Sequence, residues 1–293
     1  KKEFYLTDNE LALIKAVSDA YHKAGKKVVA LLNVCSPVET ASWRGLVDGL
    51  VCTFQPGEQT GNAIVDVLSG KVNPSGRLPQ TWPMNYGDAA ADANFPAEYV
   101  FDMSSFFKAY QNSDNMKDAA ESNQKAEAPK LVKDVDYTNY DEGIYVGYRF
   151  FDTKGVPVAY PFGYGLSYTN FDYKITDSKI DGDKCYATVS VSNVGEVPGR
   201  DVVQLYVSAP KGKLDKPKKE LRAFAKTGLI QPGQSEDVTL VWDLMDMASF
   251  DEKAHAWVLD KGIYTWEVAT DANNVKAYVQ PKVSKSQKLV VNK

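Results

Sequence analysis

Hydrophobic positions in this chain follow two different periods. Within residues 1–83, apolar residues recur at helical spacing in 8–24 and form predominantly apolar runs in 28–34 and 49–54. Runs of that kind are typical of strands that are covered on both faces of a sheet. Because helical segments alternate with these two strands, this part of the chain predicts a parallel sheet with right-handed crossover connections.

Local signals suggest where the helices of this first part begin and end. Thr7 and Glu10 have the spacing of a capping box, so we expect a helix to start after Thr7 and to stop near Gly25. The Ser-Pro pair at 36–37 predicts the start of a short second helix, with serine as cap and proline in the first turn. A third helix is expected after the Pro-Gly turn at 56–57.

From about residue 166 the period changes to two. Ala187, Val189 and Val191 alternate with polar neighbours, and turn signals such as Asp181-Gly and the Pro-Gly pair at 232–233 recur along the segment. About seven short strands of this kind predict a β-sandwich of the immunoglobulin or fibronectin type III type. The fold class expected for the chain is therefore α/β followed by all-β.

Residues 84–165 separate these two parts and differ from both. Tyr99, Met103, Phe106, Phe107 and Tyr110 fall on one face of a predicted amphipathic helix. A flexible excursion is expected over residues 112–130. The segment 145–171, which we call the aromatic strap, is dense in tyrosine, phenylalanine and glycine. So much aromatic surface requires burial, so the strap is expected to seal one domain to the next.

Charge and cysteine content exclude several classes of protein. The formal net charge of −4 argues against a nucleic-acid-binding protein, and no apolar run is long enough to span a membrane. Cys35, Cys52 and Cys185 are interpreted as buried thiols, with a Cys35–Cys52 disulfide as the alternative. The histidines are His22 and His255, and neither is near a cysteine in the sequence, so no metal site is expected.

One loop has the position of a ligand site. Residues 54–61 leave the second apolar strand and enter a helix, which is where open α/β sheets bind ligands. Gln55 and Glu58 are its candidate substrate-binding residues, and a purely structural turn is the alternative. Gly57 and Gly61 have the wrong spacing for a dinucleotide fingerprint, and no phosphate-loop lysine follows, so no cofactor is expected.

Two further features have structural interpretations. Asp141 and Glu142 are adjacent, and neighbouring residues of an extended chain point to opposite faces, so they form a poor catalytic pair. We expect them to be solvated or salt-bridged. Arg149 lies among the aromatic residues of the strap, where an arginine usually stacks and forms an ion pair.

Several motifs together resemble glycoside hydrolase family 3, which includes β-glucosidases and β-xylosidases. These are Phe4-Tyr-Leu-Thr-Asp, Val29-Ala-Leu-Leu-Asn, Ala41-Ser-Trp, Gln55-Pro-Gly-Glu-Gln, Asn73-Pro-Ser-Gly-Arg-Leu-Pro, the strap, and Val191-Ser-Asn-Val-Gly. The resemblance implies that residues 1–83 are the C-terminal part of an α/β sandwich domain and that 166–293 form a fibronectin type III-like domain. Residues 84–165 are then an insertion or linker that contains the strap.

The resemblance also implies where the catalytic groups lie. Family members carry a nucleophilic aspartate on an N-terminal (β/α)8 barrel and an acid/base glutamate in a loop just upstream of the segment that resembles Phe4-Tyr-Leu. Both carboxylates are therefore expected upstream of Lys1, and no catalytic residue can be assigned to this chain. A retaining glycosidase needs both groups about 5–5.5 Å apart.

The function expected from the resemblance is that of the C-terminal portion of a retaining, exo-acting β-glucosidase. It would act on β-linked oligosaccharides together with the barrel, and the isolated chain would be inactive. Gln55, Glu58, Phe106 and Phe107 are the candidate substrate contacts, and plain packing or a homodimer contact is the alternative for the two phenylalanines. A β-xylosidase and a non-catalytic carbohydrate-associated scaffold remain alternatives, and a nucleotide-binding α/β protein is more distant. A periplasmic or secreted location is favoured.

Overall fold

The computed structural model describes residues 4–93 and 140–291. Residues up to 89 and from 144 onward belong to one compact unit, and 90–143 belong to a second. In the second unit the described residues form the 3-10 helix η4 (Ala90–Ala93) and a turn that starts at Asp141. The predicted helix with Phe106 and Phe107, and the excursion at 112–130, lie outside the described residues.

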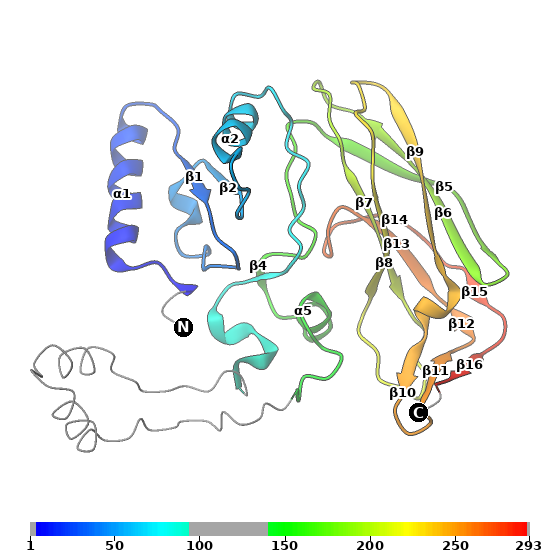
Figure 1. Ribbon diagram of the computed structural model, residues 1–293. Coiled ribbons are helices and arrows are strands. Elements are labelled where there is room, and N and C mark those ends of the chain that lie inside the picture. The colour runs from blue at the N-terminus through cyan, green and yellow to red at the C-terminus, as the bar shows by residue number, and fades with distance from the viewer. Residues whose placement is uncertain (1–3, 94–139, 292–293) are drawn as a thin grey trace, which may run out of the picture. The chain divides into compact units, whose positions relative to one another are not determined.

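The N-terminal part contains the predicted helix and the parallel strand pair (Figure 1). Helix α1 (Asp8–Lys23) begins with the expected capping box, in which the Glu10 amide donates to Thr7 Oγ1 and the Glu10 carboxylate accepts from the Thr7 amide at 2.8 Å. Strand β1 (Val29–Leu32) pairs in parallel with β2 (Gly49–Cys52). Helix α2 (Thr60–Leu68) follows β2, which completes the predicted alternation.

The helix predicted at 36–37 is wrong. Residues 33–40 are irregular, and the helical turn in this connection is the 3-10 helix η2 (Arg44–Leu46). Glu39 explains the difference, because its amide donates to the Phe4 carbonyl and its carboxylate accepts bonds from both the amide and the hydroxyl of Ser42. These contacts hold residues 33–40 in a loop in place of the helix expected there.

Burial of β1 on both faces is not observed within the described residues. Val29 and Leu31 are each 43% exposed, whereas Ala30 and Leu32 are partly buried. The two-stranded sheet is therefore covered on one face of β1 only. The exposed face carries branched apolar side chains, which normally lie in contact with other residues.

The C-terminal part is the predicted β-sandwich. One sheet has the order β5-β6-β9 and the other has the order β14-β13-β7-β8, and Figure 1 shows the two sheets face to face. The first sheet consists of β5 (Phe171–Asp181), β6 (Lys184–Asn193) and β9 (Ser235–Asp243). The second consists of β7 (Val202–Ser208), β8 (Glu220–Lys226), β13 (Thr265–Ala269) and β14 (Val275–Val279).

Shorter elements flank the sandwich and the parallel pair. Strand β3 (Trp82–Pro83) pairs with β4 (Val158–Tyr160), and β12 (Gly262–Ile263) pairs with β15 (Lys282–Val283). A further sheet consists of β10 (Ser249–Asp251), β11 (Ala256–Leu259) and β16 (Gln287–Val290). The remaining helical turns are η3 (Tyr86–Asp88) and η5 (Leu244–Met247), and the strap contains helix α5 (Tyr148–Lys154).

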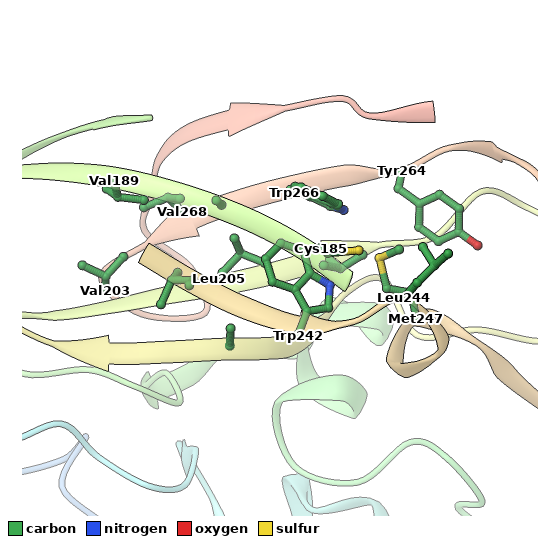
Figure 2. Close-up of a cluster of buried hydrophobic side chains, with 14 of the residues drawn as sticks. Cys185, Val189, Val203, Leu205, Trp242, Leu244, Met247, Tyr264, Trp266 and Val268 are labelled. Carbon is green, nitrogen blue, oxygen red and sulfur yellow. The ribbon is translucent and has the colours of Figure 1, made fainter. Parts of the chain in front are cut away.

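The core of the sandwich follows the period-two pattern. Along β6, Cys185, Ala187, Val189 and Val191 are fully buried while their neighbours are more exposed. Figure 2 shows core side chains from both sheets in the space between them. The two central tryptophans, Trp242 of β9 and Trp266 of β13, meet edge to face with ring centroids 4.5 Å apart.

The cysteines only partly match the prediction. Cys185 is buried, and Cys52 is partly buried in β2. Cys35 is exposed, so its predicted burial is wrong, because the irregular loop after β1 turns it away from the sheet. All three are free thiols, so the alternative Cys35–Cys52 disulfide is not formed.

The aromatic strap covers the outer face of the second sheet. Tyr206, on the outward side of β7, is fully buried and meets the Tyr148 ring at 5.8 Å, while Tyr148 stacks on Phe162 at 4.8 Å. Gln204 donates from Nε2 to the Gly163 carbonyl and accepts from the Tyr206 hydroxyl. Gly163 has a φ of +81°, and a Cβ there would collide with the Gln204 amide. The strap is therefore packed over this face, although burial is less complete than its composition predicts, since Tyr168 is 47% exposed.

Charged residues also attach the strap, and the loop that contains Arg77, to the sandwich. Arg149 forms the expected ion pair, with Glu220 at 3.3 Å. Arg77 forms an ion pair with Asp201 and also donates to the Gly165 carbonyl, and Asp201 accepts a bond from the Tyr173 hydroxyl. Only 13% of the Arg77 side chain and 3% of the Asp201 side chain are exposed. This buried pair joins a loop of the N-terminal part to the sandwich.

Candidate functional site

The candidate site is the edge of the sheet where β1 and β2 end. The two strands are parallel, with Leu32 opposite Cys52, so the loops that follow them leave from the same edge. Thr53 ties the second loop to the first strand, because both its amide and its hydroxyl donate to the Leu32 carbonyl, at 2.9 and 3.1 Å. Ligands bind at this edge in open α/β sheets.

The backbone of the loop after β2 is strained. Phe54 has a φ of +52°, and Phe54 and His255 are the non-glycine residues with positive φ in the described part of the chain. A left-handed conformation costs roughly 1–2 kcal/mol for a residue with a Cβ. Strain of this kind clusters at functional sites. The sequence gives no direct sign of it beyond the Pro-Gly pair at 56–57.

The predicted residues Gln55 and Glu58 both lie on this loop, and both are exposed. No hydrogen bond or ion pair to the described residues occupies either side chain, so both can reach a ligand. The loop is shaped by its own contacts, since the Thr60 hydroxyl donates to the Gly57 carbonyl and the Asn62 amide donates to Gln59 at 2.7 Å. The loop therefore presents an exposed amide and an exposed carboxylate at this edge.

At the opposite end of the same sheet, where β1 and β2 begin, charged residues form a cluster around Asp48. Asp48, just before β2, accepts bonds from Lys27 and His22 at 2.8 Å each and from the Val28 amide at 2.9 Å. The hydrogen bond from Lys27 and then that from Val28 hold the pKa of the Asp48 carboxyl well below its usual range. This cluster fixes the start of β1 against β2. Since Asp48 already accepts three hydrogen bonds, we interpret the cluster as structural.

The other residues singled out in the sequence do not form a catalytic site together with this loop among the described residues. Asp141 is exposed, and Glu142 is partly buried with one carboxylate oxygen that lacks a hydrogen-bond partner. Neither makes an ion pair among the described residues, so the salt-bridged form of that prediction is not observed. Phe106 and Phe107 are outside the described residues, so their proposed sugar contacts stay predictions.

Residues 4–93 and 140–291 contain neither a metal-binding cluster nor a membrane-spanning helix. No group of three His, Cys, Asp or Glu side chains in these ranges is arranged to hold a metal ion. No helix in them is both long and apolar enough to cross a membrane. Glu58 is the one carboxylate of the loop 53–59, and a single carboxylate cannot perform glycoside hydrolysis by either standard geometry.

Two family models match this chain. Residues 1–168 match the glycosyl hydrolase family 3 C-terminal domain, and residues 201–272 match a fibronectin type III-like domain. Among curated proteins, β-glucosidase A of Butyrivibrio fibrisolvens is 36% identical over 94% of this chain. A β-glucosidase of Rhizobium radiobacter is 35% identical over 91% of it.

Solved structures show the same relationship. β-Glucosidase 3B of Thermotoga neapolitana, solved in complex with glucose, is 40% identical over 98% of this chain, with a TM-score of 0.81. The β-glucosidase of Kluyveromyces marxianus, also solved with glucose, is 31% identical over 98% of the chain, with a TM-score of 0.80.

The chain is much shorter than these relatives. It spans 31% of the Butyrivibrio fibrisolvens protein, 28% of the Rhizobium radiobacter protein and 35% of the Thermotoga neapolitana structure. The match nevertheless runs through both the α/β part and the sandwich. The chain therefore belongs to glycosyl hydrolase family 3, of which it contains the C-terminal domain and the fibronectin type III-like domain.

Proposed function

We propose that these residues form the C-terminal portion of a retaining, exo-acting β-glucosidase that releases terminal glucosyl residues from β-linked oligosaccharides. The observation that carries the proposal is that relatives matching over nine-tenths or more of the chain are named β-glucosidases. Two of the similar structures contain glucose. Glucose is therefore the proposed glycone.

The catalytic carboxylates belong, in this proposal, to a part of the protein outside these 293 residues. An aspartate on an N-terminal (β/α)8 barrel attacks the anomeric carbon while a glutamic acid protonates the departing glycosidic oxygen. The same glutamate then takes a proton from water, which hydrolyses the glycosyl-aspartate with overall retention of configuration. The short coverage of the relatives supports this division, because two-thirds of their length has no counterpart here.

The described chain would contribute one wall of the substrate cleft. Gln55 and Glu58 project from the carboxyl edge of the β1-β2 pair, where hydrogen bonds to sugar hydroxyls can orient the substrate. The strained backbone at Phe54 supports a functional role for this loop. Phe106 and Phe107 could contact the aglycone, with a dimer contact as the alternative.

The open face of the small parallel sheet is proposed to be covered by the barrel-containing part. Val29 and Leu31 are exposed on β1, and 64% of Leu13 is exposed on α1. Apolar side chains on an open sheet promote aggregation unless another segment covers them. The domain boundaries that fit this arrangement are 1–83, 84–165 and 166–293.

The isolated chain is expected to be inactive, because neither catalytic carboxylate is assigned to it. The whole protein should hydrolyse an aryl β-glucoside faster than the matching aryl β-xyloside, and the 293-residue chain should hydrolyse neither. Gel filtration should show the chain associating with the separately produced remainder of the protein.

Three results would contradict parts of this proposal. Turnover by the isolated chain that a single Asp or Glu substitution abolishes would place the catalytic groups within it. Preference of the whole protein for the xyloside would favour the β-xylosidase alternative. A whole protein without glycosidase activity would favour the scaffold alternative.

A further inference from the structure

The carboxyl group of Asp152 is isolated in its surroundings. Asp152 lies on α5, inside the aromatic strap, and is partly buried. Its Oδ2 atom is inaccessible to solvent and has no hydrogen-bond partner among the described residues. No ion pair to it occurs among the described residues. Buried carboxylates are normally paired or hydrogen-bonded, because the charged form is costly to remove from water. A single unpartnered carboxyl group at this position therefore requires an explanation.

The group faces a small pocket where several segments meet. The pocket is small and open to solvent, with a volume of about 10 Å³ available to water. It is lined by Thr81, Tyr148, Phe151, Asp152, Val156, Val158, Pro161, Phe162, Ala272 and Asn273. Thr81 is 9% exposed, and its hydroxyl also has no partner. Most of the lining side chains are apolar, and none of the polar ones among the described residues donates a hydrogen bond to Asp152.

Of the charged groups around the pocket, Lys219, Glu267 and Asp271 make other contacts, whereas Lys218 makes no ion pair among the described residues. Lys219 pairs with Glu267 at 3.1 Å and lies over the Tyr206 ring at 5.2 Å. Asp271 accepts bonds from the Asn273 amide at 2.9 Å and the Asn274 side chain at 3.0 Å. Lys218 is exposed on the neighbouring loop.

The balance of these surroundings favours the neutral acid. Burial raises the pKa of the Asp152 carboxyl above its ordinary value of 3.8, and the negative charges of Glu267 and Asp271 add to the increase. The positive charges of Lys219 and Lys218 oppose it without reversing it.

We propose that Asp152 is a protonation switch for the junction between α5 and the turn that connects β13 to β14. With the carboxyl neutral, α5 stays packed through Tyr148 against the buried cluster that contains Ala272. Tyr148 also stacks on Phe162, whose carbonyl accepts a bond from the Ala272 amide at 2.9 Å. With the carboxyl ionised, the charge draws water into the pocket and α5 opens more often. The inference is independent of the proposed glucosidase activity.

The direction of the pH dependence follows from the raised pKa. An acid whose pKa is higher in the folded state binds more protons there than in the opened state. Its contribution to closure is therefore complete below about pH 3.8 and is lost as the pH rises through the folded-state value. Each unit by which the pKa is raised corresponds to about a tenfold change in the opening equilibrium.

The opening of α5 can be measured in the whole protein by amide hydrogen exchange. The exchange is carried out at several pH values between 4 and 8 and is detected by mass spectrometry. After correction for the intrinsic exchange rate, the wild-type peptide that covers α5 should open more at high pH, while a peptide from β6 should not. Asp152→Asn should remove the pH dependence and should keep α5 closed at pH 8. Asp177→Asn is the matched control, because Asp177 is exposed on β5 and has no ion pair among the described residues.

Two outcomes would overturn the proposal. The first is a wild-type protein in which the opening of α5 changes with pH no more than the opening of β6. This comparison uses the wild-type protein alone, so it does not require any variant to fold. The other is faster exchange of α5 in Asp152→Asn at neutral pH, which would show that the carboxylate stabilises the junction. An effect of Asp177→Asn on α5 equal to that of Asp152→Asn would also contradict a local switch.

Discussion

Replacing Trp266 with alanine is expected to lower the free energy of unfolding by about 3–5 kcal/mol. Trp266 is fully buried in the centre of the sandwich, in edge-to-face contact with Trp242 (Figure 2). Its indole nitrogen has no hydrogen-bond partner, so the loss comes from packing and from the cavity that alanine leaves. Urea unfolding followed by far-ultraviolet circular dichroism measures the change without relying on tryptophan fluorescence.

Phe224→Ala provides the control for this prediction. Phe224 is on β8 of the same sheet, but 69% of it is exposed. Its replacement should change the free energy of unfolding by less than about 0.5 kcal/mol. A loss below about 1 kcal/mol for Trp266→Ala, or equal losses for the two variants, would show that Trp266 is not part of a tightly packed core.

Asp201→Asn is expected to cost about 3–5 kcal/mol, because it leaves the largely buried Arg77 guanidinium without its counter-charge. The substitution also weakens the bond that Asp201 accepts from the Tyr173 hydroxyl. Burial, followed by the charge of Asp201, raises the pKa of Tyr173 above its usual range, so this hydroxyl remains a donor at neutral pH. Denaturant unfolding of the purified variant measures the loss.

A triple variant separates the ion pair from general disruption of the junction. Arg77→Met, Tyr173→Phe and Asp201→Leu together remove both charges and the hydroxyl while keeping similar volumes. Removing a whole buried pair is often neutral or stabilising, so the triple variant should recover most of the stability that Asp201→Asn loses. A triple variant less stable than Asp201→Asn would mean that the charged network contributes net stability.

Short-range signals in the sequence predict much of the fold. The Thr7–Glu10 capping box marks the start of α1, and the apolar runs at 28–34 and 49–54 contain the parallel pair. The period-two alternation of β6 identifies the core face of the sandwich. In each case the residues that carry the signal are neighbours in the chain, so the local pattern determines the local structure.

Long-range contacts explain what the sequence does not predict. Arg77 and Asp201 are 124 positions apart, and the sequence around either residue does not indicate that the two form a pair. The predicted helix at 36–37 fails because a contact from Phe4 to Glu39 holds that segment in a loop. The pocket around the Asp152 carboxyl group is lined partly by Asn273, which is far from Asp152 in the sequence. Pattern analysis cannot detect such pairings.

The candidate site was predictable only as a position. The strand-to-helix transition correctly places Gln55 and Glu58 on a loop at the carboxyl edge of the sheet. The unusual φ of Phe54 could not be foreseen, because bulky residues rarely adopt it. The open face of β1 also differs from the prediction, since its apolar run implies cover that the described residues do not provide.

The most direct measurement of the central claim is covalent trapping of the nucleophile in the whole protein. A 2-deoxy-2-fluoro β-glucoside with a good leaving group should form a glycosyl-enzyme that breaks down slowly, because a retaining mechanism passes through a covalent intermediate. Peptide mapping by mass spectrometry then locates the label. We expect the label on an aspartate in a peptide outside residues 1–293, as the proposed division of the enzyme requires. A label on Glu58, or on any other carboxylate of this chain, would contradict it.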